Sequence, residues 1–159
     1  MKKQASSLSS SDGENRTVFV YLMTIFGAAQ QRLKDRMRSA EMDGLGPLHM
    51  RLLCLNLEQP GCTQQRLADL VGRDKGQVAH LIHALQGQGL MTRTPDPADA
   101  RLLRMDVTAA GALQAQRFMA MEAALATALF TGLDPQQIKL LQRVTDQMLW
   151  ITSTLADTD

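Results

Sequence analysis

The sequence is poor in aromatic residues, proline and cysteine. Of its 159 residues, 4% are aromatic, five are proline and two are cysteine. The core must therefore come mainly from aliphatic residues and methionine, and this composition favours helices over a sandwich of short strands. Two cysteines, Cys54 and Cys62, do not make a disulfide framework, so we expect a reducing compartment, the cytoplasm.

Net charge and long apolar runs are also lacking. The formal charge is +1, so the case for a nucleic-acid partner must rest on local arrangement rather than on bulk charge. The longest uncharged apolar stretch, residues 18–29, is shorter than the roughly 20 residues that span a bilayer. A polar, Ser-rich segment stands where the apolar part of a signal peptide would be. We expect a globular protein with no membrane partner.

The order of the predicted elements is mostly helical. Residues 1–14 show no apolar period and predict a disordered tail. A long amphipathic helix follows within residues 15–46, then helices over 47–58, 63–71 and 74–87. Period-two alternation predicts a hairpin of strands 90–94 and 103–107, and two more helices cover 108–130 and 134–155.

The middle of the chain carries a helix-turn-helix pattern. Ala68, Gly72 and Val78 have the spacing at which a small residue lets two helices approach, glycine makes the turn and valine fills the angle. Thr63 and Asp74 are suitable N-caps for the two helices. Since a hairpin follows, the pattern predicts a mainly α fold with a small β-hairpin wing, a winged helix-turn-helix within residues 47–107.

Four segments resemble the MarR family of bacterial transcription regulators. They are residues 63–70 (TQQRLADL), 85–93 (LQGQGLMTR), 96–101 (DPADAR) and 107–111 (VTAAG). The resemblance covers about residues 16–156. It implies a homodimer formed by residues 15–46 and 108–159, a palindromic double-stranded DNA operator, and repression relieved by a small ligand or by thiol oxidation.

The second helix of the motif supplies the predicted base-reading residues. With Val78, Leu81, Ile82 and Leu85 turned inward, the outward positions are Gly76, His80 and His83, flanked by Gln77 and Ala79. Gln77 is suited to adenine and Lys75 to phosphate. The family usually has small hydroxyl residues at 76, 77 and 79 and often arginine at 80, so this chain departs from it there. The complete predicted DNA-binding set is Thr63, Lys75, Gly76, Gln77, Ala79, His80, His83, Arg93, Asp99 and Arg101.

The resemblance implies that Arg101, in the wing, contacts the minor groove or the DNA backbone. Asp99 cannot attract phosphate, so we expect it to orient Arg101 or Arg93 through an ion pair. His80 and His83 are three residues apart, but no nearby cysteine completes a metal site, and we predict neither metal nor cofactor.

The two cysteines and a possible ligand crevice give further expectations. Cys54 should be a buried, inert thiol, whereas Cys62 precedes an N-cap, a position that can lower a thiol pKa. The family's peroxide sensors usually carry their cysteine near the start of the first helix, where this chain has none. The family's crevice for small aromatic acids or phenols would involve Met23, Phe26, His49, Met50, Arg51 and Met119.

No Ser-His-Asp set, phosphate loop or metal-protease motif occurs, so we do not expect an enzyme. The sequence predicts a dimeric, sequence-specific DNA-binding regulator, a repressor of its own or a neighbouring gene, released by a small aromatic ligand. One alternative is a winged-helix module that binds protein instead of DNA, because residues 60–106 hold six basic and five acidic side chains. A thiol-based redox sensor is the other alternative.

Overall fold

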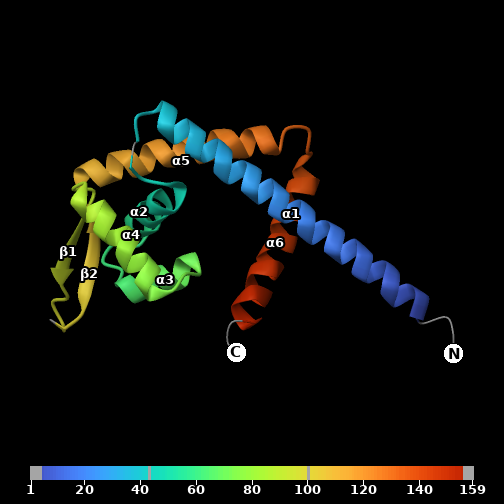
Figure 1. Cartoon of the computed structure of the whole chain (residues 1–159), viewed down its shortest axis with the longest axis horizontal. Coiled ribbons are helices and arrows are strands. Elements are labelled where there is room, and N and C mark those ends of the chain that lie inside the picture. The colour runs from blue at the N-terminus through green and yellow to red at the C-terminus, as the bar shows by residue number, and fades with distance from the viewer. Residues whose placement is uncertain (1–4, 43, 100, 156–159) are drawn as a thin grey trace. The chain divides into compact units, whose positions relative to one another are not determined.

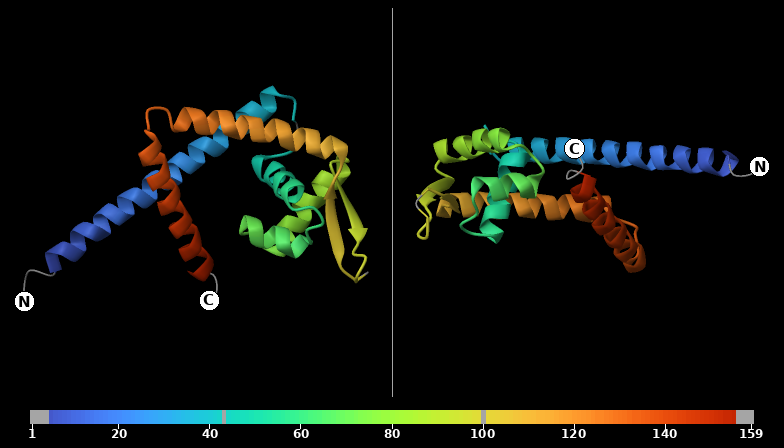
Figure 2. Two further views of the ribbon diagram at one scale, coloured as in Figure 1. Left: turned by 180° about the vertical axis from the view of Figure 1, so that it is seen from behind. Right: turned by 90° about the horizontal axis from the view of Figure 1, so that it is seen from below.

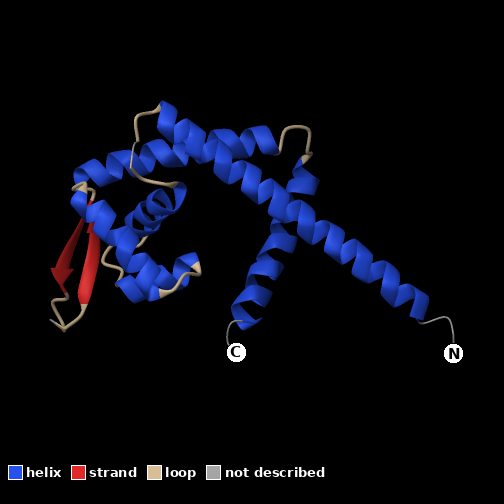
Figure 3. Ribbon diagram, viewed as in Figure 1, coloured by secondary structure: helices blue, strands red, loops and turns tan. Residues whose placement is uncertain are grey.

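The computed structural model describes residues 5–42, 44–99 and 101–155. It consists of six helices and one two-stranded antiparallel sheet in these ranges (Figures 1 and 3). The predicted fold class, mainly α with a β-hairpin wing, is confirmed. The chain divides into two compact units between Glu122 and Ala123.

The first unit contains the winged module. Its elements are α1 (Ala5–Ser39), α2 (Pro47–Glu58), α3 (Gln64–Val71), α4 (Lys75–Gly87), β1 (Met91–Pro95), β2 (Leu103–Val107) and the first part of α5 (Ala109–Leu129). Figure 2 shows α2, α3 and α4 gathered beside the hairpin, with α1 extending away from them as one unbroken helix. The second unit holds the end of α5 and α6 (Pro135–Leu155).

Helix α1 begins earlier than its sequence pattern indicates. It starts at Ala5, so the predicted disordered tail is wrong for residues 5–14; residues 1–4 lie outside the described part of the chain. Serines have modest helix propensity, but extending an existing helix costs far less than nucleating one. The amphipathic segment that follows provides the nucleus, which a period search of the tail alone does not detect.

The core of the first unit lies between α2, α4, α5 and the hairpin. Its fully buried side chains include Leu52, Leu53, Ile82, Met105 and Phe118. They are aliphatic, sulfur-containing or, in one case, aromatic, as the composition predicts. This core fixes the position of α4 relative to the wing.

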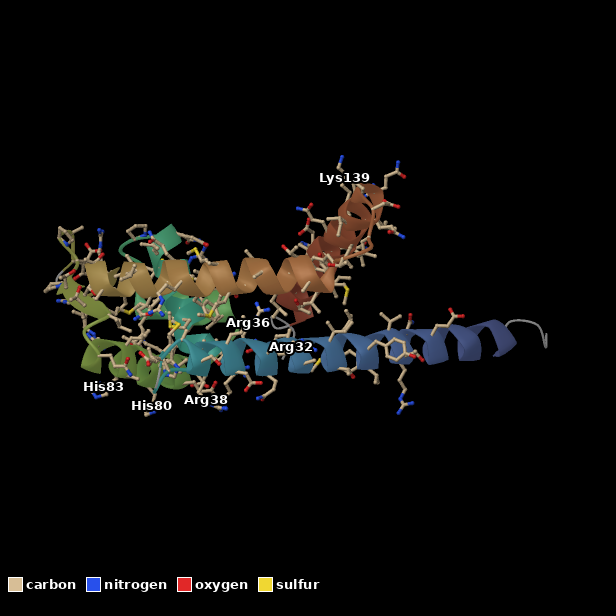
Figure 4. All side chains as sticks on the ribbon, turned by 90° about the horizontal axis from the view of Figure 1, so that it is seen from above. Arg32, Arg36, Arg38, His80, His83 and Lys139 are labelled. Atoms are coloured by element: carbon tan, nitrogen blue, oxygen red, sulfur yellow. The ribbon has the colours of Figure 1, made fainter. Side chains whose placement is uncertain are left out.

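Two arginines join α1 to α5. The Arg36 guanidinium donates to the carbonyl oxygen of Met121 at 3.2 Å, and Arg117 donates to that of Ala40 at 3.0 Å. Figure 4 shows Arg36 between the two helices. No helix in the described ranges is long and apolar enough to cross a membrane.

Candidate DNA-binding interface

Side-chain caps and one left-handed residue set the angle between α3 and α4. The Thr63 hydroxyl accepts a hydrogen bond from the Arg66 N–H at 3.2 Å, and the Asp74 carboxylate accepts one from the Gln77 N–H at 2.9 Å. Between the helices, Gly72 has φ +61°, a conformation that glycine adopts without steric cost. The predicted caps and turn are therefore confirmed.

A further bond ties the two helix starts together. The side-chain amide of Gln64 donates to the carbonyl oxygen of Lys75 at 3.0 Å. This bond joins the first residue of α3 to the first residue of α4. Sequence reasoning missed it, because a glutamine on a helix's first turn gives no sign of its tertiary partner.

Helix α4 has the two faces that its sequence predicts. Val78, Ile82 and Leu85 have 0% exposure. The exposed residues of the predicted reading set are Lys75, Gly76, Gln77, His80 and His83, whereas Ala79 is half-buried. In Figure 4 the side chains of His80 and His83 project from the same side of the molecule as Arg38. The helix thus offers a polar, accessible surface on a rigid, packed support.

The wing is joined to the helix-turn-helix through Cys62 and Thr63, which lie just before α3 and pair with β2. Strands β1 and β2 pair antiparallel from Met91 opposite Val107 to Pro95 opposite Leu103. The Met105 N–H donates to the carbonyl oxygen of Cys62 at 2.9 Å, and Thr63 forms a bridge with Arg104. The residue that caps α3 is consequently also attached to the wing, so the wing and α3 are held together.

Asp96 organises the tip of the wing. One of its carboxylate oxygens accepts from the N–H groups of Ala98 at 2.7 Å and Asp99 at 3.3 Å, and the other forms an ion pair with the Arg104 guanidinium. The Ala98 bond first, and the Arg104 partner second, lower the pKa of Asp96 below its usual value. Asp96 was not among the predicted site residues, because its pairing with Arg104 depends on the strand register.

The expected role of Asp99 is wrong in its detail. Its carboxylate accepts from the backbone N–H of Arg101 at 3.0 Å, and the described residues show no ion pair between Asp99 and the guanidinium of Arg93 or Arg101. A short aspartate side chain two residues earlier reaches a backbone N–H easily, as in other Asx turns. Arg93 and Arg101 are exposed, so their guanidinium groups are accessible from solvent.

Of the six residues predicted for a ligand crevice, Met50 lines one of the two hollows described here and the other five line neither. Met50 is buried and lines a hollow of about 210 Å³, while Met23 and Phe26 are 53% and 56% exposed on α1. Arg51 is exposed and Met119 is half-buried. A larger hollow of about 370 Å³ has another lining within the described residues: Lys34, Met37, Arg38, Met42, Gly44, Leu45 and Gly46.

His49 has a structural role at the start of α2. Its Nδ1 atom accepts a hydrogen bond from the Gly46 N–H at 3.0 Å, which caps the start of α2. Burial first, and the nearby His80 second, lower the pKa of His49 below 6.5. The neutral imidazole is the form that can accept this bond.

The cysteines are free and differ in burial. Cys54 has 0% exposure, and its thiol donates to the carbonyl oxygen of Ala115 at 3.7 Å. Burial first, and the nearby Glu122 second, raise the pKa of Cys54 to about 11. Cys54 is therefore the buried, inert thiol that the sequence predicts, whereas Cys62 is half-buried. In the described residues no group of three or more His, Cys, Asp or Glu side chains could hold a metal.

A capped helix pair, an exposed second helix and a docked hairpin together define a winged helix-turn-helix protein. The sequence pattern of the MarR family matches residues 46–103, which confirms the resemblance over this segment. No curated protein matches the chain.

Three solved structures share the fold of this chain. FabT of Streptococcus pneumoniae in complex with DNA is 16% identical, with a TM-score of 0.78 over 89% of this chain and 99% of that one. The MepR–DNA complex of S. aureus is 17% identical, with a TM-score of 0.73 over 83% and 94%. BpsR of Bordetella bronchiseptica is 20% identical, with a TM-score of 0.64 over 80% and 98%.

Proposed function

We propose that this protein is a dimeric, sequence-specific DNA-binding transcriptional regulator and not an enzyme. The observation that carries the proposal is α4: Val78, Ile82 and Leu85 on its inner face are fully buried. On its outer surface Lys75, Gln77, His80 and His83 are exposed. A helix of this kind is suited to the major groove. The shared fold with the FabT and MepR complexes supports DNA as the partner.

Several residues of this interface have roles that follow from their chemistry. Gln77 pairs with the N6 and N7 atoms of adenine, while Lys75 and Arg93 contact phosphate. Gly76 and the half-buried Ala79 allow the helix backbone to approach the bases closely. Arg101, on the wing, enters the minor groove.

The dimer is proposed from large apolar side chains that are exposed on two helices. On α1 these are Val18, Phe19, Val20, Tyr21, Met23, Ile25 and Phe26, each at least 45% exposed. On α6, Leu149 is 68% exposed. Apolar surface of this extent marks an interaction site, and a second copy gives two recognition helices about 34–36 Å apart, matching a palindromic operator. Sedimentation of a monomer at micromolar concentration would contradict this.

A small aromatic acid is the proposed effector, and repression the proposed regulatory effect. BpsR, whose DNA binding is regulated by 6-hydroxynicotinic acid, has the same fold. A thiol switch at Cys54 has less support, because the burial of Cys54 and its pKa of about 11 keep that thiol protonated.

The test is a selection of duplexes from a random-sequence pool, followed by titration at about 50 and 200 mM salt. Preferred binding of one sequence with a steep loss of affinity at high salt is expected. The Gln77→Ala variant should lose preference at one base position, and Lys75→Ala should reduce the salt slope by about one. Lys139→Ala, on α6, serves as the matched control and should change neither. Failure to enrich any sequence at low salt would refute DNA regulation and favour the protein-binding alternative.

A further inference from the structure

The tip of the wing presents two consecutive apolar side chains to solvent. Leu102 is 48% exposed and Leu103 is 39% exposed. A single exposed leucine on a protein surface is ordinary. Here the pair lies directly after Arg101, the residue proposed to enter the minor groove.

The backbone around Leu102 is held in place. Its N–H donates to the carbonyl oxygen of Asp99 at 2.9 Å, and its own carbonyl oxygen accepts from the Asp96 N–H at 2.9 Å. Asp96 is itself paired with Arg104 on the neighbouring strand. Two hydrogen bonds therefore hold the backbone at Leu102, which lowers the conformational entropy that this residue loses when it meets a partner.

We propose that Leu102 is an apolar minor-groove contact, which packs against the deoxyribose walls while Arg101 lies in the groove. This rests on the proposed function. Minor-groove proteins commonly use apolar side chains, leucine among them, together with basic residues. The Arg101 N–H is bound by the Asp99 carboxylate, so the same wing turn fixes the backbone at both residues. Leu102 then contributes affinity that does not depend on counterion release.

The dependence of DNA affinity on salt distinguishes the contribution of Leu102 from that of Arg101. Covering the exposed part of one leucine is worth roughly tenfold in affinity, and no phosphate charge is neutralised. Leu102→Ser should weaken binding to the selected duplex about tenfold, with an unchanged slope of affinity against salt. Arg101→Ala should weaken binding and also reduce the slope by about one.

Matched variants complete the experiment. Leu102→Met keeps an apolar side chain and should bind almost as the unmodified protein does. Leu113→Ser removes a leucine that is 59% exposed on α5, and it should leave DNA affinity unchanged. Hydroxyl-radical cleavage reports on deoxyribose in the minor groove, so Leu102→Ser should lose protection only at the minor-groove positions that the wing contacts.

The outcomes distinguish this inference from the proposed function. If the unmodified protein binds a preferred duplex and Leu102→Ser binds equally well, the inference is overturned while the regulator stands. A reduced salt slope in Leu102→Ser also overturns it, because the substitution has then displaced Arg101. If the unmodified protein binds no DNA, the proposed function itself fails.

Discussion

Gly111 lies where the start of α5 presses against the chain that leaves α4. A Cβ atom at this position would lie 2.0 Å from the carbonyl oxygen of Leu90 and 2.8 Å from Cγ1 of Val107. Real Cβ contacts essentially never fall below 3.0 Å, so the Gly111→Ala substitution requires α5 and Leu90 to separate by about 1 Å. The obstacle is backbone, which cannot rotate away as a flexible side chain can.

The cost of that separation can be worked out from two contributions. Overpacking of a tight contact costs about 1–3 kcal/mol. The carbonyl oxygen of Leu90 also accepts from the Thr108 N–H at 3.1 Å, and losing this bond costs about 1 kcal/mol. We expect Gly111→Ala to lower the free energy of unfolding by about 2–4 kcal/mol, a large share of the roughly 5–15 kcal/mol that holds a domain together.

Urea denaturation followed by circular dichroism measures this change, at one fixed protein concentration because association alters apparent stability. Gly87→Ala is the matched control, since a Cβ there meets nothing within 4 Å. It should be neutral or stabilising by up to about 1 kcal/mol. If Gly111→Ala unfolds within about 0.5 kcal/mol of the unmodified protein, the close approach of α5 to Leu90 is refuted.

Two further predictions concern titratable groups. Burial first, and the nearby His80 second, lower the folded pKa of His49, so the unfolded chain binds its proton first. The contribution of this group to the free energy of unfolding is therefore fully present above about pH 6.5 and is lost as the pH drops towards the folded pKa. The His49→Gln variant keeps a hydrogen-bond acceptor at this capping position but does not titrate. The urea midpoints of the unmodified protein and of this variant should therefore diverge between about pH 7.5 and 5.5. Midpoints that stay parallel would contradict the lowered pKa of His49. For Cys54, a pKa of about 11 leaves about one thiol in a thousand ionised at pH 8. The Cys62→Ala variant, in which Cys54 is the remaining cysteine, should therefore react with a disulfide reagent only after denaturant is added. Rapid labelling of the folded variant would show that Cys54 is accessible.

Local signals in the sequence determined the elements of the winged module. Thr63 and Asp74 cap the helices that they were predicted to cap, and Gly72 makes the turn between them, because capping and left-handed turns depend on a few consecutive residues. The buried face of α4 followed from its apolar spacing for the same reason. The start of α1 could not be predicted from local signals, since its Ser-rich end becomes helical by extension of the amphipathic segment.

Contacts between distant residues were decided by the tertiary structure alone. The pairing of Asp96 with Arg104 requires the register of β1 and β2, and the bond from Gln64 to Lys75 requires the angle between α3 and α4. The close approach of Gly111 to Leu90 requires α5 to be docked. Periodicity and caps report which face of an element is buried, but each side-chain partner is selected by how packed elements meet, and that information is spread over the whole chain.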